Sequence, residues 1–507
     1  MSEAKSNSNS IVKVIGASSL GTLIEWYDFY IFGSLATIIG KHLFPADSGA
    51  SALINTLAIF AAGFIVRPFG ALIFGHLGDL VGRKYTFLLT LVLMGGSTFL
   101  IGLIPSYETI GYLAPILVLL LRLVQGLALG GEYGGAATYV AENAPANKRG
   151  FYTSWIQITA TLGLFLSLGI IVVTKNLLGQ EVFSNWGWRI PFLISILLVG
   201  ISIYIRLKMH ESPQFSQLKK EGKTSANPLK ESFGKRANFK MVLLALFGAT
   251  MGQGVVFYTG QFYAQSFLEN TCKVDFNESR YILLWAIAFA TPFFVVFGSW
   301  SDRVGRKWIM LTGMLLGVLF YRPIYQIFID KTNYNYQSTE ILQQKAPTYN
   351  SVLIAGSPDS LLTETNFKKV NDGAQFTEIK TTQVFAGKKP KEQKIEILDK
   401  ILPKSTFWLF VFLIFFQILL VTIVYGPIAA FLVELFPTKI RYTSMSLPYH
   451  IGNGVFGGLV PFIATLMASF EGSTALSGLW YPMGVALLCF IIGSLYLNND
   501  KQNKTHD

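Results

Sequence analysis

Two carboxylates and one arginine stand inside long apolar stretches of the sequence, where ionised side chains are rare. Glu25 and Asp28 lie in a run over about residues 14–38, and Arg67 lies in the next run. Charges in lipid are costly, so they usually face a cavity and mark the path of a solute or ion. Glu25 and Asp28 share one helix face. A carboxylate in a low-dielectric cavity keeps its proton unless a cation is close, as a proton carrier requires. The alternative for both acids is an internal ion pair with Arg67 or Arg122.

A second group of polar residues lies in the run over residues 112–141. Gln125 and Glu132 are seven residues apart and share a face, with Arg122 within about a quarter turn of them. We predict Glu132 as a further proton site and Arg122 and Gln125 as solute contacts. Gly126 and Gly130 form a small-x3-small pattern that is typical of close helix packing.

Later apolar runs carry further polar side chains. Tyr258 and Gln261 lie in the seventh run, Tyr425 in the tenth, and His450 and Asn453 in the eleventh. We predict contacts with the solute for Tyr258, Gln261, Tyr425 and Asn453, and a titrating role for His450. For each residue the alternative is a structural hydrogen bond to a neighbouring helix.

The elements that must position these residues are membrane-spanning helices. The chain is 51% hydrophobic and only 14% charged, with a mean hydropathy of +0.46, whereas soluble domains carry about 25% charge. Runs of roughly 20 apolar residues can cross a bilayer as helices. We place twelve such runs at about 14–38, 51–74, 85–104, 112–141, 151–174, 189–208, 240–268, 280–299, 308–328, 405–436, 443–470 and 479–497.

Lysine and arginine in the short loops predict the orientation of these helices. Residues 206–240 are strongly basic, whereas the loops 105–111 and 471–478 on the opposite side contain no lysine or arginine. Basic loops stay in the cytoplasm, so both termini and the central loop are predicted to be cytoplasmic. The net charge of +12 is then explained by membrane anchoring rather than by a nucleic-acid surface.

The chain repeats itself, which indicates two homologous halves. Residues 75–84 recur as 298–307 with an offset of 223, and residues 142–149 recur as 434–441 with an offset of 292. The difference of 69 residues predicts an insertion in the second half. We place it at 329–404, where the sequence turns polar. Strand-like stretches predict a small β-rich subdomain, with a poorly ordered loop as the alternative.

The repeated segments hold paired charges at helix ends, where carboxylates favour helix N-termini and cations pair with carboxylates. Such clusters can latch the two halves together and release them as the protein changes state. The alternative is a basic turn that only sets topology. The predicted gating residues are Asp79, Arg83, Glu142, Arg149, Asp302, Arg306, Glu434 and Arg441.

The repeated Gly-x3-Asp-x2-Gly-Arg-Lys turn at 75–84 resembles the signature loop of the major facilitator superfamily. Further motifs resemble its metabolite:proton symporter family, which contains proton symporters for citrate, 2-oxoglutarate, shikimate, and proline or glycine betaine. These solutes all carry a carboxylate, so the resemblance implies that Arg67 binds one through paired hydrogen bonds. An internal ion pair remains the alternative for Arg67. The motifs are Glu25–Tyr30, Gly63–Gly70, Arg122–Glu132, Trp188–Phe192, Glu211–Phe215, Glu434–Arg441 and Gly452–Gly458.

We therefore expect an all-α membrane protein of twelve helices in two pseudo-symmetric six-helix bundles, with a small extracytoplasmic insert between helices 9 and 10. The expected parts are an N-terminal bundle (1–208), a cytoplasmic linker (209–239), a C-terminal bundle (240–497), the insert within it (329–404) and a cytoplasmic tail (498–507).

The expected function is import of a small carboxylate-bearing or zwitterionic solute by proton symport, through alternating access, in the bacterial inner membrane. The protein is expected to be monomeric and to use the proton gradient without a cofactor. An enzyme is disfavoured, since the sequence shows no metal-spaced His/Cys cluster, phosphate-binding loop or nucleophile elbow. The alternatives are a proton-independent uniporter or exchanger of organic acids, and a transporter-like membrane sensor.

Overall fold

The computed structural model describes residues 16, 19, 22–45, 48, 50–81, 83–131, 133–207, 233–333, 341–344, 346–353, 360–371, 373–384, 394–436 and 441–498. In this part of the chain, ten helices are long and apolar enough to cross a membrane. A shorter apolar helix over Leu88–Leu103 and the helical residues 22–34 with α2 (Ala36–Leu43) correspond to the other two predicted spans. The prediction of twelve membrane helices is confirmed.

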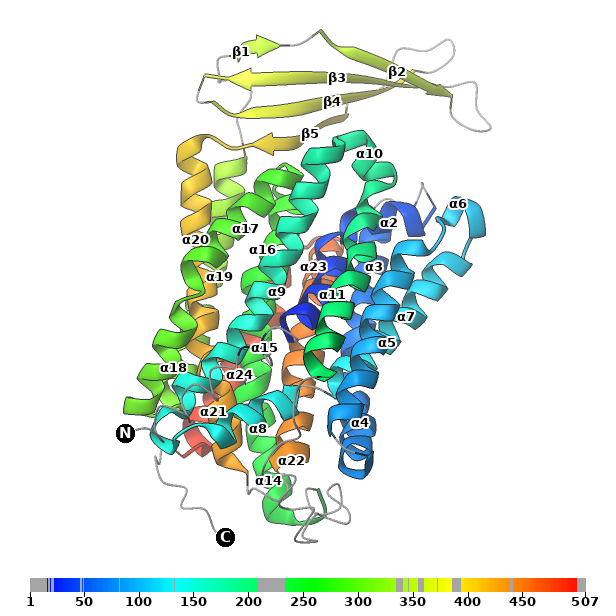
Figure 1. Ribbon diagram of the computed structural model, residues 1–507. Helices are drawn as coiled ribbons and strands as arrows, with labels where there is room; N and C mark the ends of the chain where they lie inside the picture. Colours follow the sequence, from blue (N-terminus) through cyan, green and yellow to red (C-terminus); the bar gives the residue numbers. More distant parts are fainter. Residues whose placement is uncertain are drawn as a thin grey trace, which may run out of the picture. The chain divides into compact units, whose positions relative to one another are not determined.

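The helices of the first half (Figure 1, blue to green) are frequently broken within a predicted span. Helix 2 is split into α3 and α4, and the single span predicted over 112–141 is two helices, α7 and α8, separated at Gly131. The elements are α3 (Ala50–Ile65), α4 (Arg67–Val81), α5 (Arg83–Leu103), α6 (Tyr107–Ile110), α7 (Leu113–Gly130), α8 (Tyr133–Asn143), η2 (Ala146–Lys148), α9 (Arg149–Leu178), α10 (Gln180–Asn185), η3 (Gly187–Arg189) and α11 (Ile190–Leu207).

The second half contains breaks and π-helical segments where polar residues lie. Helix 7 contains the π-helical segments η4, η5 and η6, and helix 11 contains η7. Its helical elements are α14 (Arg236–Ala245), η4 (Leu246–Thr250), α15 (Met251–Tyr258), η5 (Thr259–Tyr263), α16 (Ala264–Ser266), η6 (Phe267–Thr271), α17 (Phe276–Ala290), α18 (Phe293–Val304), α19 (Lys307–Thr332), α20 (Lys404–Tyr425), α21 (Ile428–Leu435), α22 (Arg441–Tyr449), η7 (His450–Gly457), α23 (Val460–Ser469), η8 (Ser477–Leu479) and α24 (Trp480–Tyr496).

The chain divides into two compact units. The first comprises Met1–Tyr263, Ile287–Tyr321 and Phe416–Asp507, and the second comprises Ala264–Ala286 and Arg322–Phe415. In the first unit, α9 of the first half packs on α18 of the second, and α3 and α4 pack on η7. Counted as membrane spans in chain order, α9 is helix 5, α18 belongs to helix 8, α3 and α4 form helix 2, and η7 belongs to helix 11. Helix 5 therefore contacts helix 8, and helix 2 contacts helix 11, as expected for two halves related by a pseudo-two-fold axis.

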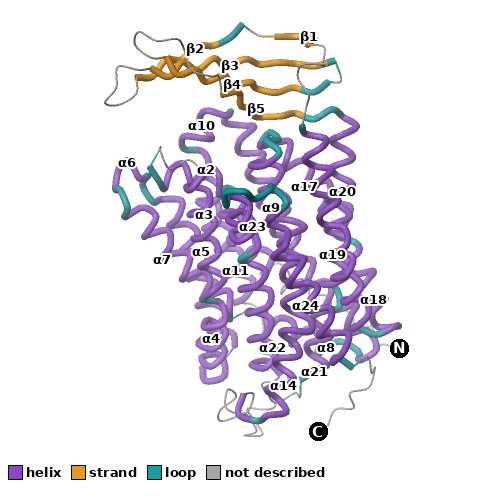
Figure 2. Tube along the Cα trace, turned by 180° about the vertical axis from the view of Figure 1, so that it is seen from behind, coloured by secondary structure: helices purple, strands orange, loops and turns teal. Residues whose placement is uncertain are grey.

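The second unit contains the insert, which forms an antiparallel sheet (Figure 2, orange). The strand order is β1-β3-β4-β5, with β2 also paired to β3. Gly373, at φ 91°, lies in the tight turn between β3 and β4, where a side chain would be strained. The strands are β1 (Ile341–Gln344), β2 (Thr348–Leu353), β3 (Ser360–Val370), β4 (Gln375–Val384) and β5 (Lys394–Ile401).

The last strand of this sheet is bonded to the connector between helices 7 and 8. The N–H of Lys400 donates to the carbonyl of Lys273, and the N–H of Asp275 donates to the carbonyl of Lys400, both at 2.9 Å. The Lys400 ammonium donates to the carbonyl of Thr332 at the end of α19, at 2.6 Å. The insert is thus fixed to the connector and to helix 9.

Candidate functional site

A helix break positions Arg67. Helix 2 is interrupted at Val66, and Arg67 is the first residue of α4. Pro68 follows and lacks an N–H, so it suits the first turn of a helix, where that donor has no partner. Helix 2 is therefore interrupted just before a proline that suits the first turn of a new helix.

Glycines bring helix 2 against helix 4 at this point. A Cβ added at Gly126 would lie 1.9 Å from the carbonyl oxygen of Gly63, and one added at Gly130 would lie 2.1 Å from that of Arg67. Any side chain at either position would overlap the backbone of helix 2. The predicted packing role of these two glycines is confirmed, and it fixes the backbone that carries Arg67.

The Arg67 side chain is buried among aromatic rings. It is 1% exposed, and its guanidinium carbon lies 4.2 Å from the centroid of the Phe64 ring and 4.4 Å from that of Phe29. Its Nε and Nη2 atoms have no hydrogen-bonding partner, and among the described residues no carboxylate pairs with it. A Cβ added at Gly454 of η7 would lie 3.3 Å from the Arg67 Cδ. Arg67 therefore presents unused donors where helix 2 meets helix 11.

Arg122 differs, because Nη1 and Nη2 of its guanidinium donate hydrogen bonds within the first half, although its Nε has no partner. Its Nη1 donates to Oε1 of Gln125 at 2.8 Å, and Gln125 donates in turn to Oγ1 of Thr98 at 2.7 Å. Arg122 also donates to the carbonyls of Phe29 and Phe60, each at 3.4 Å. The structure brings Arg122 and Gln125 together in a buried network that ties helices 1 to 4.

The two acids of helix 1 are fully buried. Glu25 is 0% and Asp28 is 1% exposed, and they are close enough to interact electrostatically. The Asp28 carboxylate faces helix 3, because a Cβ added at Gly95 of α5 would lie 3.2 Å from its Oδ2. Its Oδ1 has no partner. In the described part of the structure, Asp28 is not paired with Arg67 or Arg122, so the predicted internal ion pair is not formed by this residue.

Tyrosine and histidine side chains from helices 1, 7 and 11 complete a central polar cluster with Arg67. Tyr258, Tyr30 and His450 are each at most 1% exposed. The Tyr258 hydroxyl interacts with Tyr30 and with Arg67, whereas neither ring nitrogen of His450 has a hydrogen-bonding partner. Arg67 interacts electrostatically with Tyr258 and with His450. Gln261, in η5, is likewise buried with both amide atoms unpaired. We define the central cluster as Arg67, Tyr30, Tyr258 and His450.

A hydrogen-bonded chain of side chains lies beside this cluster. Gln253 donates to Asn453 at 3.2 Å, and Asn453 donates to the Tyr449 hydroxyl at 3.4 Å. The Tyr449 hydroxyl shares a 2.7 Å hydrogen bond with that of Tyr425. The Tyr449 ring stacks on Tyr133 of the first half, with centroids 3.5 Å apart and planes at 5°. Tyr425 and Asn453 thus lie in a network that reaches the other half of the protein.

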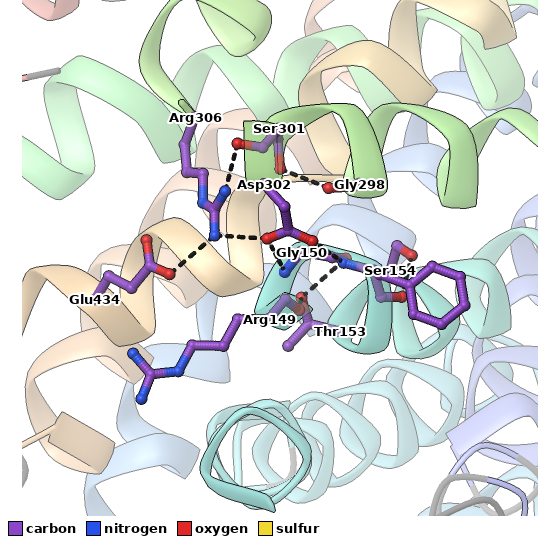
Figure 3. Close-up of polar contacts among 10 residues, drawn as sticks. Arg149, Gly150, Thr153, Ser154, Gly298, Ser301, Asp302, Arg306 and Glu434 are labelled. Carbon is purple, nitrogen blue, oxygen red and sulfur yellow. Dashed lines mark hydrogen bonds and ion pairs between the residues drawn. The ribbon is translucent and has the colours of Figure 1, made fainter. Parts of the chain in front are cut away.

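At the end predicted to be cytoplasmic, Asp302 joins the two halves (Figure 3). Its carboxylate accepts hydrogen bonds from the backbone N–H groups of Gly150 at 2.8 Å and Phe151 at 2.9 Å, in the first turn of α9. Arg306 pairs with Asp302 at 2.8 Å and with Glu434 at 3.0 Å. The predicted gating residues Asp302, Arg306 and Glu434 therefore form one connected cluster.

Close backbone contact supports this cluster. A Cβ added at Gly150 would lie 2.3 Å from the carbonyl oxygen of Gly298 in α18. Arg149 lies in the same region without an ion pair to the other residues in Figure 3. Arg441 begins α22 and donates from Nε to the carbonyl of Phe436 at 3.1 Å. Glu132 lies outside the described residues, as do the side chains of Asp79, Arg83 and Glu142.

Comparisons with known proteins decide the family. Residues 13–242 match the Sugar (and other) transporter family. The xylose transporter XylE of Escherichia coli has a similar fold, with a TM-score of 0.64 at 15% identity over 97% of this chain and 99% of that one. The inner membrane metabolite transport protein YhjE of E. coli is 33% identical over 491 residues, 96% of this chain and 94% of the relative. The chain belongs to the major facilitator superfamily.

Within this superfamily the protein is similar to metabolite transporters. The proline/betaine transporter of Salmonella typhimurium is 38% identical over 313 residues, 60% of this chain and 62% of that protein. The protein is therefore a multi-pass membrane transporter and not an enzyme. The packing of helix 5 on helix 8 and of helix 2 on helix 11 is therefore packing between the two halves of a major facilitator transporter.

Sequence reasoning missed several residues of this transporter's polar interior. Tyr30, Tyr133, Gln157 and Tyr449 are buried, and Gln157 donates to the Tyr133 hydroxyl at 2.6 Å. Tyr30 ends the helix 1 motif that begins at Glu25, and Tyr449 directly precedes His450. Their position beside predicted site residues was thus the signal that could have revealed Tyr30 and Tyr449. Tyrosine alone is a weak signal, because it is also common at lipid interfaces.

Proposed function

We propose that the protein imports a small carboxylate-bearing solute together with a proton. The observation that carries this proposal is Arg67, a buried guanidinium with unpaired Nε and Nη2 donors where the two halves meet. A buried charge without a partner is strongly unfavourable. A guanidinium binds a carboxylate through two parallel hydrogen bonds, so a solute carboxylate would satisfy this site.

Proton coupling is assigned to Asp28, with Glu25 beside it. A buried carboxylate without a cation nearby favours its protonated form, and the Asp28 Oδ1 has no partner in the described part of the chain. Protonation would accompany loading from the outside, and return of the proton to the cytoplasm would follow rocking of the halves. The proton gradient is the energy source, and no cofactor takes part.

The proposed location is the inner membrane, with both termini and the Asp302 cluster on the cytoplasmic side and the insert outside. The basic loops support this orientation. Release of the contacts between Asp302 and the first turn of α9 would open the cytoplasmic path. The contacts of helix 2 with helix 11 would separate in the same movement.

Binding of matched ligand pairs tests the role of Arg67. Small organic acids and their amides are added to the purified protein, and the shift in the midpoint of thermal unfolding is recorded. At least one acid should stabilise the wild type while its amide does not, and Arg67→Lys should lose most of that shift, since lysine lacks the paired donors. Arg236→Lys, at an exposed site, is the control. Equal shifts for wild type and Arg67→Lys would contradict the assignment.

A further inference from the structure

The last strand of the insert, β5, lies at a junction of four membrane helices. Lys400 is paired through the main chain with the connector between helices 7 and 8, and its ammonium donates to the Thr332 carbonyl at the end of helix 9. Leu402, directly after β5, donates its N–H to Oε1 of Glu278 in the first turn of helix 8, at 3.2 Å. Helix 10 begins two residues later, at Lys404. β5 is therefore hydrogen-bonded or covalently joined to the same end of helices 7 to 10.

Helices 7 and 8 are also joined to one another beside this junction. Arg280 of α17 forms an ion pair of 3.0 Å with Glu269 of η6, and its side chain is 1% exposed. Removing one partner of such a buried pair is strongly destabilising. Asp275 accepts hydrogen bonds from the N–H groups of Asn277 at 2.8 Å and Glu278 at 3.1 Å, and so caps the start of α17. The connector is thus held at its helix 8 end, and β5 pairs with a fixed segment.

Helices 7 and 9 each contain a weak point farther from the insert. Helix 7 contains the π-helical segment η5, and such wide turns are often found at functional sites. Pro323 lies inside α19, where it removes a main-chain hydrogen bond. The compact unit that contains the sheet begins at Ala264 in helix 7 and at Arg322 in helix 9, beside these two weak points. Without a connection between them, the ends of the two helices would bend independently.

We infer that the insert is a clamp, in which β5 holds the ends of helices 7 to 10 together so that they move as one body during transport. The inference goes beyond the proposed function, because it depends on the transporter fold and not on the solute or on proton coupling. Alternating access moves the helices of one half against those of the other. With the clamp intact, bending of helix 7 at η5 is coupled to bending of helix 9 at Pro323.

Cys272, at the start of the connector, reports the state of the clamp. It is 2% exposed, and its thiol interacts with Thr332 and Lys400, two residues of the junction. Burial raises the pKa of the thiol to about 11, and a protonated, buried thiol is inert. Cys489 is also buried, in helix 12, and provides an internal reference away from the junction.

Spin labels at the exposed positions Thr271 and Lys331, at the ends of helices 7 and 9, test whether these ends move together. The wild type should give one narrow distance distribution, which persists when Asp302→Ala shifts the conformational equilibrium. The double variant Glu278→Leu/Lys400→Pro removes the Glu278 acceptor and both donors of Lys400, and should broaden the distribution. Glu278→Gln/Lys400→Arg keeps these donors and acceptors and is the matched control. A broad distribution in the wild type, or a narrow one in the first double variant, would overturn the clamp.

Labelling by a membrane-impermeant maleimide separates release of the clamp from general unfolding. Cys272 should react slowly in the wild type and about tenfold or more faster in Glu278→Leu/Lys400→Pro, because lost hydrogen bonds favour local opening. Cys489 should stay unlabelled in both. If the double variant exposes Cys489, Glu278→Leu alone takes its place, and a Cys272 rate equal to that of the wild type would then overturn the inference. Rapid labelling of Cys272 in the wild type would overturn it as well.

Discussion

Asp302 of α18 accepts a hydrogen bond of 2.8 Å from the backbone N–H of Gly150, at the start of α9. A carboxylate of the second half thus caps a helix of the first half, where the helix dipole and unpaired N–H groups favour a negative charge. The contact requires glycine, because a side chain at Gly150 would overlap the Gly298 carbonyl. The motif at 298–307 therefore contributes the carboxylate, and the motif at 142–149 ends where the capped helix begins.

Removal of this acid should shift the transporter towards a state that is open at the Asp302 end. Asp302→Ala removes two backbone hydrogen bonds to a charged acceptor, each contributing about 1.5–3 kcal/mol, and leaves Arg306 with Glu434 and the Ser301 carbonyl as partners. Spin labels at the exposed positions Lys148 and Val304 should report a longer mean distance in the variant. Glu434→Gln should change it less, because Glu434 is partly exposed and its pair with Arg306 is screened by solvent. An unchanged distance distribution in Asp302→Ala would argue against a latch.

The packing of helix 2 on helix 4 predicts a contrast between two glycines. Gly126→Ala places a methyl 1.9 Å from the Gly63 carbonyl oxygen, and forced overpacking costs about 1–3 kcal/mol. Gly96→Ala is the control, because a Cβ there meets nothing within 4 Å and the helix propensity gained is the same. Thermal unfolding should show a lower midpoint for Gly126→Ala alone. Equal unfolding midpoints for the two variants would mean that helices 2 and 4 lie farther apart than the structure shows.

The sequence predicted the helices and the charged cluster around Asp302 better than the interior contacts. Apolar runs and two repeated motifs suffice for twelve spans, because bilayer thickness and backbone hydrogen bonding leave few alternatives. The position of Arg122 could not be predicted, since its partners include main-chain carbonyls of Phe29 and Phe60, which no side-chain pattern reveals. The break at Val66 does have a signal in the sequence, because Pro68 suits the first turn of a new helix.

The anchoring of the insert through Lys400 can be tested by hydrogen exchange. Lys400→Met removes the hydrogen bond to the Thr332 carbonyl and should speed exchange of amides in β5 and in the connector 272–275. Lys369→Met on β3 is the control. Unaltered exchange in β5 would show that main-chain pairing alone holds the insert.

The same lysine predicts a pH dependence for this anchor. Burial lowers the pKa of Lys400 from its ordinary value of 10.5, so the folded state binds fewer protons than the unfolded state between the two values. Local stability should therefore rise with pH from the lowered pKa towards 10.5. Exchange protection of β5, corrected for the intrinsic rate, should follow this trend in the wild type and lose it in Lys400→Met. A fall in protection over this range would contradict the assignment.

The stack of Tyr133 on Tyr449 should couple the two halves energetically. Stacked aromatic pairs contribute about 0.5–1.5 kcal/mol beyond the area they bury. Leucine substitutions at each position and at both, compared by thermal unfolding as a double-mutant cycle, should give a coupling of that size. Tyr449→Phe should keep the coupling while breaking the hydroxyl contact with Tyr425. Fully additive effects would indicate that the stack does not join the halves.

Solute accumulation under an imposed proton gradient tests the central claim most directly. Proteoliposomes containing the wild type should concentrate a carboxylate-bearing solute only when the outside is more acidic, and entry should alkalinise the external medium. Asp28→Asn should abolish accumulation against a gradient while still permitting exchange of labelled for unlabelled solute, because it removes the proton site and leaves Arg67 intact. Accumulation that persists without a proton gradient, or in Asp28→Asn, would contradict the account.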